Sequence, residues 1–432
     1  MNDFIRYAKE LLRRPWLRPR NPKFSSGPCA KPPGYNLRLL KQILLGRSHR
    51  SKPSKEAIQD LLNKTRNILG LPDDYRICIM PASDTGAFEA ALWNMLGERP
   101  ADVCAWEAFG KKWLKDVREK LRIPGMTLLE PRYGVLPDLS PIHFDHDVVI
   151  TENGTTSGVM APRGDWIPEK RAGLTFSDAT SAVFAIPMQS WDRYDVVTYS
   201  WQKGMGGEAG FGMLILSPRA IKRLNTYTPD NRPIPVIFEL KKDGQFNEEI
   251  AKGNTINTIS MMCVEDARAS LNWMIKETER LKKRGVVNDK AAVLEVMHQR
   301  TQKNFQALSA WVERTPWIDF LVNDPTIRSP SSVCLKLNED YFPEWREEEK
   351  AALCKKLVGI VEAHKAGYDF NAYKTAPAGL RIWCGPTVEA TDVARLTKWI
   401  DWAFLRCCRE MGISHRPALV TRQGESNTEL RV

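Results

Sequence analysis

The segment TYSWQKGMGG (residues 198–207) is the strongest local feature of the sequence, because a strand runs there into polar residues, then into Lys203, and then into glycines. A lysine at the end of a buried strand can lie in a closed pocket, where desolvation lowers its pKa and makes the free amine accessible. Such an amine forms Schiff bases with carbonyl compounds. A surface lysine in a turn is the alternative, so the assignment depends on the residues around it.

Asp178 follows a short apolar strand at residues 174–176, and one more strand, at 196–199, separates it from Lys203. In a parallel sheet both side chains then emerge at the carboxyl edge, where ligands bind. An aspartate there can hold the protonated pyridine nitrogen of pyridoxal phosphate (PLP), which that cofactor needs as an electron sink. A helix cap is the alternative role for Asp178.

Short apolar runs alternate with helical patterns from residue 55 to about 220. An amphipathic helix is expected at 55–69, where Gly70 ends it. Ser83 is expected to cap a helix after the strand at 76–80, and a further helix is expected at about 110–121. This alternation predicts an α/β fold with a largely parallel sheet covered on both faces. The other strands are expected at 103–106, 126–129, 147–151, 173–176, 196–199 and 211–216.

The rest of the chain suggests a second, smaller unit. Residues 226–258 are rich in Pro, Asn and Thr and are expected to cross the surface, and long helices follow at about 260–283 and 289–313. From about 320 the pattern reads strand, helix, strand, helix, at 332–337, 347–366, 380–384 and 389–411. We therefore expect an N-terminal extension at 1–20, a large cofactor-binding α/β domain at 21–320 and a small α+β domain at 321–432.

Three further segments could bind anions or a planar ring. Hydroxyl groups and helix N–H groups at 81–86 suit a phosphate, and the segment SHRS (residues 48–51) offers a second anion site. Arg381 stands in an otherwise apolar strand and needs a partner or a carboxylate ligand. Phe109, in a strand-to-helix loop, could stack on a planar ring, although an isolated aromatic residue more often belongs to the core.

Two other patterns are rejected. Residues 204–209 match the dinucleotide-binding fingerprint by letters, but a strand follows them where that fingerprint requires a helix. The segment HFDHD (residues 143–147) resembles a metal cluster, yet no further His or Cys set completes it in the sequence. It is interpreted as a solvated loop, and no metal site is expected.

Composition excludes several classes of protein. The 432 residues carry 63 Lys and Arg against 52 Asp and Glu, a net charge of +11. The basic residues are scattered and no recognition signature accompanies them, so the charge is expected to attract acidic metabolites rather than nucleic acid. No apolar run is long enough to cross a membrane. The nine cysteines include no CxxC pair and are typical of buried residues in a reducing compartment.

The N-terminus leaves the location open between two compartments. Apolar residues at 4, 5, 8, 11 and 12 follow a helical spacing among arginines, which also suits a mitochondrial presequence. Asp3 and Glu10 argue against a presequence. A surface helix of a cytoplasmic protein is therefore preferred, and the mitochondrial matrix is the alternative.

Six motifs in order resemble one family. They are FSSGPCAKPPG (24–34), SHRSK (48–52), PASDTGAFEAALW (81–93), NGTTSG (153–158), SWQKGMGGE (200–208) and GLRIWCG (379–385). Together they are similar to the phosphoserine aminotransferases, class V enzymes of the fold-type I PLP group, from about residue 21 to 415. The resemblance implies a mostly parallel seven-stranded sheet and a small C-terminal domain. It also implies a homodimer with shared active sites.

The resemblance assigns roles to individual residues. Lys203 matches the lysine that binds PLP covalently, and Asp178 the partner of its pyridine nitrogen. Thr155 matches the residue that contacts the phenolic oxygen, and Phe109 stands where relatives stack an aromatic ring. The implied phosphate contacts are Ser83, Asp84, Thr85 and Gln202, with Asn257 and Thr258 from the neighbouring subunit. The implied substrate contacts are His49 and Arg50 for the phosphate and Arg381 for the carboxylate, with Lys374 as a further substrate-binding cation.

The expected reaction exchanges an amino group between O-phosphoserine and 2-oxoglutarate, with glutamate as the other amino acid, as in serine biosynthesis. The sequence departs from the family pattern at Lys374, where relatives can carry Arg or His-Arg, and at Gly210 and Phe211. A lysine keeps the charge but loses the bidentate fork of arginine. Alternatives are a PLP-dependent lyase or desulfurase of the same fold, a serine or alanine aminotransferase, and a basic nucleic-acid-binding protein without a cofactor.

Overall fold

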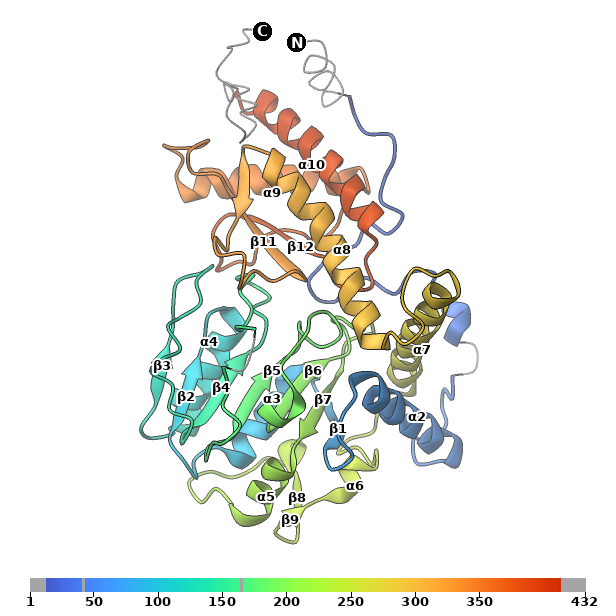
Figure 1. Ribbon diagram of the computed structural model, residues 1–432, viewed down its shortest axis with the longest axis vertical. Coiled ribbons are helices and arrows are strands. Elements are labelled where there is room, and N and C mark those ends of the chain that lie inside the picture. Colours follow the sequence, from blue (N-terminus) through green and yellow to red (C-terminus); the bar gives the residue numbers. More distant parts are fainter. Residues whose placement is uncertain (1–12, 41–42, 164–165, 413–432) are drawn as a thin grey trace.

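A seven-stranded sheet forms the centre of the larger part of the molecule (Figure 1). The computed structural model describes residues 13–40, 43–163 and 166–412, and the helix expected at residues 4–12 lies outside them. The strands are parallel apart from β7, which runs antiparallel to both of its neighbours. In spatial order they are β1 (Arg76–Pro81), β7 (Phe211–Leu216), β6 (Val196–Ser200), β5 (Thr175–Asp178), β4 (Asp147–Thr151), β2 (Ala101–Cys104) and β3 (Thr127–Leu129). The predicted fold class and its seven strands are confirmed.

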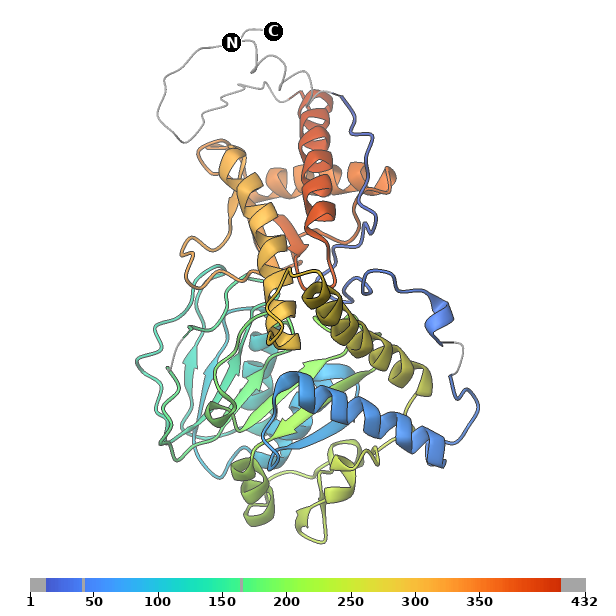
Figure 2. The same cartoon turned by 45° about the vertical axis from the view of Figure 1, so that its right-hand side comes forward.

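Both faces of this sheet are covered, because successive residues of its strands enter different cores. In β1, Ile77 and Ile79 belong to one hydrophobic cluster, and Cys78 and Met80 to the other. Fully buried strands of this kind read as continuous apolar runs. One face packs on α3 (Ser83–Met95), α4 (Ala108–Lys115) and α5 (Pro218–Thr226). The helices α2 (Lys52–Leu69), α7 (Met261–Lys283) and α8 (Val293–Arg314) contribute to the other cluster (Figure 2).

The C-terminal part is built on a three-stranded antiparallel sheet in the order β10 (Ile318–Phe320), β11 (Ser332–Leu337), β12 (Gly379–Trp383). Its helices are α9 (Glu347–Ala363) and α10 (Ala390–Glu410), and α8 rises beside α10 in Figure 1. The sequence pattern did not predict β10. Since β10 pairs with β11, the expected division at residue 320 falls just after a strand of the smaller sheet.

The N-terminal segment joins the C-terminal part to the larger part. Trp399 Nε1 donates to the carbonyl of Leu17, and the backbone N–H of Arg20 donates to Asp392. The Trp383 N–H donates to the Phe24 carbonyl at 3.0 Å. Residues 17–24 therefore contact the C-terminal part, before the chain reaches the large sheet.

Most helices and strands begin and end close to the residues that the sequence pattern predicts. The N-terminal cap of α3, however, differs from the prediction. Gly70 ends α2 in the left-handed conformation with φ +62°, as expected. Ser83 was expected to cap α3, but Ala82 occupies the cap position and Ser83 is the first helical residue.

The remaining short elements are η1 (Leu37–Leu40), a π-helical turn η2 (Asp116–Leu121) that continues α4, η3 (Trp191–Arg193), η4 (Val236–Phe238), β8 (Lys241–Lys242), β9 (Gln245–Phe246) and α6 (Glu248–Ala251). None of the helices among the described residues is long and apolar enough to cross a bilayer.

Candidate active site

The site lies at the carboxyl edge of the large sheet, where the chain leaves β1, β2, β4, β5 and β6. Lys203 follows β6 and is 7% exposed. Its Nζ donates a hydrogen bond to the carbonyl of Ser26. Burial lowers the pKa of Lys203, and the nearby Arg381 cation acts in the same direction, whereas Cys29 opposes the shift. The structure thus contains the desolvated amine that the sequence predicts.

A glycine leaves the room that the lysine needs. A Cβ atom at Gly27 would lie 2.7 Å from Lys203 Nζ and 2.8 Å from its Cε. Any side chain at position 27 would therefore displace the end of the lysine. The segment that contains Gly27 also contacts the loop at residues 201–210, which carries Lys203 and is called the lysine loop below. In this contact the Cys29 N–H donates to the Gln202 carbonyl at 2.8 Å.

Asp178 is the last residue of β5 and is buried. Its Oδ2 accepts from Trp113 Nε1 at 2.9 Å, and its Oδ1 accepts from the Thr180 N–H at 3.1 Å. Burial raises the pKa of the neighbouring Asp84 well above its usual value, and the proximity of Asp178 raises it further. The two buried carboxyl groups therefore lie close enough to interact electrostatically.

The start of α3 offers fewer backbone donors than the sequence suggests. The Ser83 N–H donates to the Gly210 carbonyl, and the Asp84 N–H donates to Ser200 Oγ at 2.8 Å. An anion would therefore meet the hydroxyl groups of Ser83 and Thr85 rather than those two N–H groups. Gly86 is required in this turn, since a Cβ there would lie 2.0 Å from the Pro81 carbonyl oxygen.

Phe109 lies in the first turn of α4, and its ring centroid is 5.9 Å from Lys203 Nζ. Glu107, the cap of that helix, fixes this turn through two contacts. One carboxylate oxygen accepts from the Gly110 N–H at 2.6 Å, and the other accepts from Thr156 Oγ1 at 2.9 Å. Thr155, which directly precedes Thr156, donates through Oγ1 to Ser181 Oγ at 2.8 Å.

A cavity of about 750 Å³ opens beside the lysine and contains the predicted carboxylate-binding residues. Arg381, on β12, and Lys374 both line it, together with Gly27 and Cys29. The Arg381 guanidinium lies 5.7 Å from the centre of the Tyr373 ring. Its Nε is buried, and no acceptor for it is found among the described residues. A buried cationic donor of this kind is suited to an anionic ligand.

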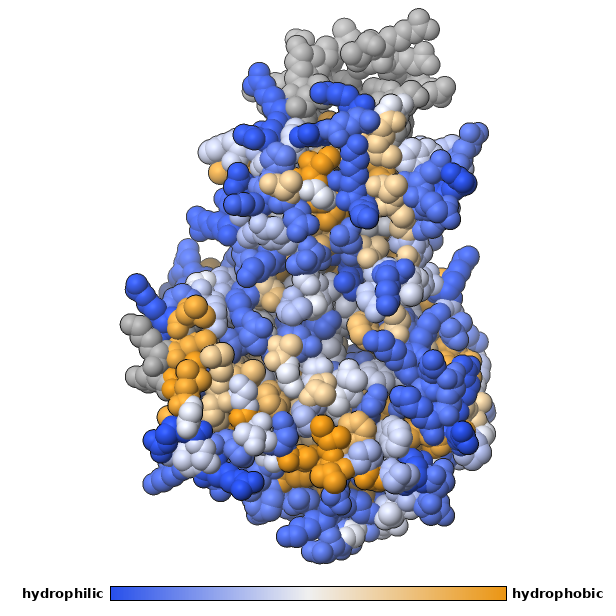
Figure 3. Space-filling view, turned by 180° about the vertical axis from the view of Figure 1, so that it is seen from behind, coloured by the Kyte–Doolittle hydropathy of each residue, from blue (hydrophilic) through white to orange (hydrophobic). Residues whose placement is uncertain are grey.

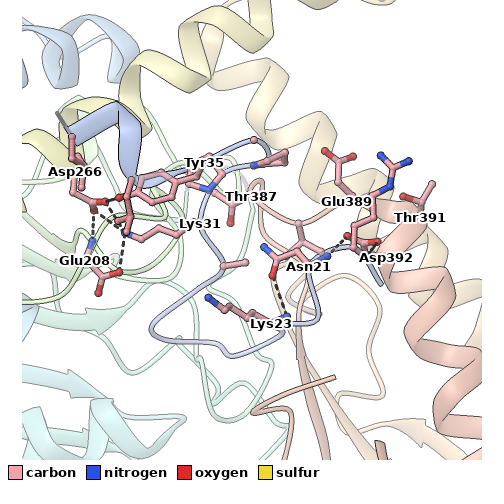
Figure 4. Close-up of a pocket in the computed structure, with 18 of the residues that line it drawn as sticks. Asn21, Lys23, Lys31, Tyr35, Glu208, Asp266, Thr387, Glu389, Thr391 and Asp392 are labelled. Carbon is pink, nitrogen blue, oxygen red and sulfur yellow. Dashed lines mark hydrogen bonds and ion pairs between the residues drawn. The ribbon is translucent and has the colours of Figure 1, made fainter. Parts of the chain in front are cut away.

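A second cavity, of about 840 Å³, adjoins the first and shares Lys23, Lys31 and Glu208 with it. Figure 4 shows Asp266, on α7, accepting from Lys31 and Tyr35. Asp266 also accepts from the Glu208 N–H at 2.7 Å. This carboxylate therefore fastens the N-terminal segment and the loop after Lys203 to α7.

Four predicted residues lie outside this arrangement in the single chain. His49 and Arg50 stand immediately before α2 and line neither cavity. Asn257 and Thr258 are exposed in the loop before α7, where Asn257 Nδ2 contacts the Thr258 carbonyl at 3.3 Å. The chain thus brings together the predicted cofactor residues of one subunit, and it leaves these four at other surfaces.

Sequence reasoning missed Trp113, Glu107, Tyr373 and Ser26. Trp113 follows Phe109 by one helical turn, a spacing that could have suggested a shared face. Glu107 directly precedes the expected helix, where an acidic cap is common. The Ser26 contact is made by a backbone carbonyl, so its side chain carries no signal for it.

The comparisons with known proteins agree with this geometry. No family model matches the chain. The phosphoserine aminotransferase of Methanosarcina mazei is 48% identical over 391 residues, which cover 90% of this chain and 99% of that protein. The chain belongs to the phosphoserine aminotransferase family. The enzyme of Methanosarcina barkeri is similar to the same extent, with 48% identity over 90% of this chain.

Solved phosphoserine aminotransferases share the fold. The enzyme from Cytophaga hutchinsonii superposes with a TM-score of 0.71 at 20% identity, covering 90% of this chain and 98% of that one. The enzyme from Bacillus circulans subsp. alkalophilus gives 0.68 at 18% identity, covering 90% and 99%. The two-part architecture described above is therefore the architecture of this family.

Glu107 provides a test of the site's electrostatics. Burial raises its pKa from 4.5 to about 7. The unfolded chain ionises this carboxyl first as the pH rises, so its contribution to stability is full below about pH 4.5 and is lost toward pH 7. We expect the wild type to lose up to about 3 kcal/mol of unfolding free energy to this group between pH 4.5 and 8. Glu107→Gln should lack this loss.

The measurement is urea unfolding of both proteins at pH 5 and pH 8. Between these values the midpoint should fall more for the wild type than for Glu107→Gln. Equal shifts in the two proteins would show that Glu107 is ionised at both pH values and that its burial does not govern its titration.

Proposed function

We propose that this chain is a PLP-dependent aminotransferase that converts O-phospho-L-serine and 2-oxoglutarate reversibly into 3-phosphooxypyruvate and L-glutamate, in serine biosynthesis. The observation that carries the proposal is the buried amine of Lys203, which shares the carboxyl edge of the sheet with Asp178 and Phe109. Membership of the phosphoserine aminotransferase family supports the choice of substrate.

The residues present fit PLP. Lys203 would hold the cofactor covalently, Asp178 would bind its pyridine nitrogen, and Phe109 would stack on its ring. Asp178 can accept this further donor because each carboxylate oxygen has two lone pairs. Phosphate contacts would come from Ser83, Asp84, Thr85 and Gln202, and the buried Gln202 Oε1 meets no partner among the described residues. A related enzyme from Trichomonas vaginalis has been solved with PLP bound.

When bound, PLP supplies an electron sink that stabilises negative charge at the substrate Cα. Lys203 would act as the base that removes the proton from Cα, because burial lowers the pKa of its amine and so favours the neutral form that can accept a proton. Asp178 would contact the pyridine nitrogen of a bound cofactor, and a carboxylate beside that nitrogen favours its protonated form. Ser26 and Gly27 lie against the amine and contribute to its burial, since Lys203 is 7% exposed.

The substrate's two anionic ends need separate cation sites. Arg381, with its unmatched Nε, binds the α-carboxylate, and Lys374 adds a point charge at the same cavity. His49 and Arg50 bind the phosphate of phosphoserine or the side-chain carboxylate of glutamate, since both are anions at the same end. The desulfurase alternative is disfavoured, because burial raises the pKa of Cys334 to about 12 and Cys384 is buried as well.

The active unit is proposed to be a homodimer in which Asn257 and Thr258 reach the cofactor phosphate of the neighbouring subunit. Both residues are exposed in the single chain. Large apolar side chains nearby in the sequence are exposed as well, with Val236 at 77% and Met262 at 49%. Figure 3 shows apolar patches on the back of the larger part, as expected of a surface that a partner covers.

We also propose that the chain divides at residue 320 into a large and a small domain, that residues 1–20 form an N-terminal extension, and that the protein is cytoplasmic. The curated relatives from Methanosarcina come from microorganisms without mitochondria, which favours the cytoplasm over the mitochondrial matrix. No nucleic acid or membrane is proposed as a partner.

Lys203→Ala should abolish transamination, because it removes both the covalent attachment of PLP and the base at Cα. Borohydride reduction of the wild-type holoenzyme, followed by peptide mass mapping, should place the cofactor on Lys203. The exposed Lys222→Ala serves as the control and should keep both activity and label. Activity retained in Lys203→Ala would refute the assignment.

Arg50→Ala should lower kcat/KM for phosphoserine by roughly ten- to a hundredfold, since a charge-assisted hydrogen bond contributes about 1.5–3 kcal/mol. The absorbance of the bound cofactor should not change. Steady-state kinetics with phosphoserine and serine measure the effect, and the exposed Arg47→Ala is the matched control. If the ratio of the two substrates is the same in wild type and Arg50→Ala, the phosphate site lies elsewhere.

Shared active sites predict complementation between two inactive variants. Lys203→Ala subunits mixed with Asn257→Ala/Thr258→Ala subunits should form hybrid dimers in which one site has every wild-type residue. At full exchange about half of the dimers are hybrids, so activity should approach about a quarter of the wild-type value. Sedimentation measures the dimer in parallel. An active monomer, or no recovery in confirmed hybrids, would contradict the shared site.

A further inference from the structure

His143 and His146 acquire a third potential metal ligand when the chain folds. The segment HFDHD (residues 143–147) has no further His or Cys nearby in the sequence, but the fold places Asp102, on β2, beside it. His146 Nδ1 lies 2.9 Å from Asp102 Oδ1, and His143 Nδ1 lies 3.9 Å from Asp102 Oδ2. The candidate ligand atoms of the three residues all lie within 4.8 Å of one another.

The charge of Asp102 provides a second reason to examine this cluster. Its side chain is 0% exposed, and among the described residues its ion-pair partners are these two histidines, with no lysine or arginine. Its other contact is the His143 N–H, at 2.7 Å. A buried carboxylate needs a compensating cation. A divalent ion held between this carboxylate and the two imidazoles supplies such a charge.

The spacing and the ligand types suit a zinc-class ion. Zinc binds nitrogen and oxygen ligands at about 2.0–2.2 Å, so the ligand atoms of a tetrahedral ion lie about 3.4 Å apart. The distances of 2.9 and 3.9 Å bracket this value. Two imidazoles favour Zn²⁺, Co²⁺ or Ni²⁺ over Mg²⁺ or Ca²⁺, which prefer oxygen ligands. His143 is 66% exposed, so a water molecule can complete the coordination.

We propose that Asp102, His143 and His146 bind a zinc-class divalent ion. The ion takes the place of the His146–Asp102 hydrogen bond, and His146 then presents Nδ1 as a lone pair and carries its proton on Nε2. Asp102 is near the amino end of β2, and His146 precedes the amino end of β4. The site therefore lies at the sheet edge opposite Lys203, where it anchors the loop between β3 and β4.

The test is titration of the PLP-loaded wild-type enzyme with Co²⁺, followed by visible d–d absorption, and with Zn²⁺, followed by calorimetry. We expect one ion per chain. His143→Ala should weaken binding at least about tenfold, and its transamination activity should stay at the wild-type level because the site is remote from Lys203. His364→Gln, which removes a histidine from α9's C-terminal end, is the matched control and should bind as wild type does.

Two further measurements make the result decisive. Borohydride-reduced enzyme should bind Co²⁺ with the same affinity, which distinguishes this site from metal bound at the cofactor. His146→Ala should lose the d–d band, and circular dichroism should show that both variants are folded. The absence of saturable Co²⁺ binding in the wild type, or binding that His143→Ala leaves unchanged, would overturn the proposal.

Discussion

The whole site depends on holding one buried lysine amine in place inside the protein. Lys203 is desolvated, so its Nζ must have an acceptor, and that acceptor is the carbonyl of Ser26, 177 positions earlier in the chain. The segment around Ser26 is held in turn by both parts of the molecule. The backbone N–H of Trp383, in the three-stranded sheet, donates to the Phe24 carbonyl. The backbone N–H of Cys29 donates to the carbonyl of Gln202, which directly precedes Lys203. The placement of the lysine is therefore linked to the C-terminal part, the large sheet and the N-terminal segment together.

Asp266 connects the segments that hold Lys203 to the surface proposed for the dimer. It is 1% exposed and accepts from Lys31 and Tyr35 of the N-terminal segment and from the Glu208 N–H of the lysine loop. Asp266 belongs to α7, which begins three residues after Thr258. A shift of α7 would thus move both the lysine loop and the residues that we propose to reach the neighbouring subunit.

The sequence predicts the sheet well because its strands, with the exception of β3, are almost entirely buried and so read as short apolar runs. The expected bounds of β4, β7 and β11 match the structure, and Lys203 and Asp178 come together because parallel strands end at one edge. Features made by distant segments could not be predicted this way. Trp113 reaches Asp178 across two strands, Asp102 meets His146 from another strand, and the Ser26 contact uses backbone atoms. The short β10 has too few residues to give a period-two signal.

The division of the proposed substrate contacts has a consequence for specificity. Arg381 and Lys374 lie at the cavity beside Lys203, whereas His49 and Arg50 belong to the start of α2 and contact neither Lys203 nor Asp178 in the single chain. Groups near Lys203 influence the pKa of its amine, and the Arg381 cation already lowers it. A second strong cation at the same distance would lower that pKa further. We propose that placing the phosphate-binding cations on a separate element avoids this conflict, so that a doubly charged substrate can be bound without altering the electrostatics on which the lysine depends.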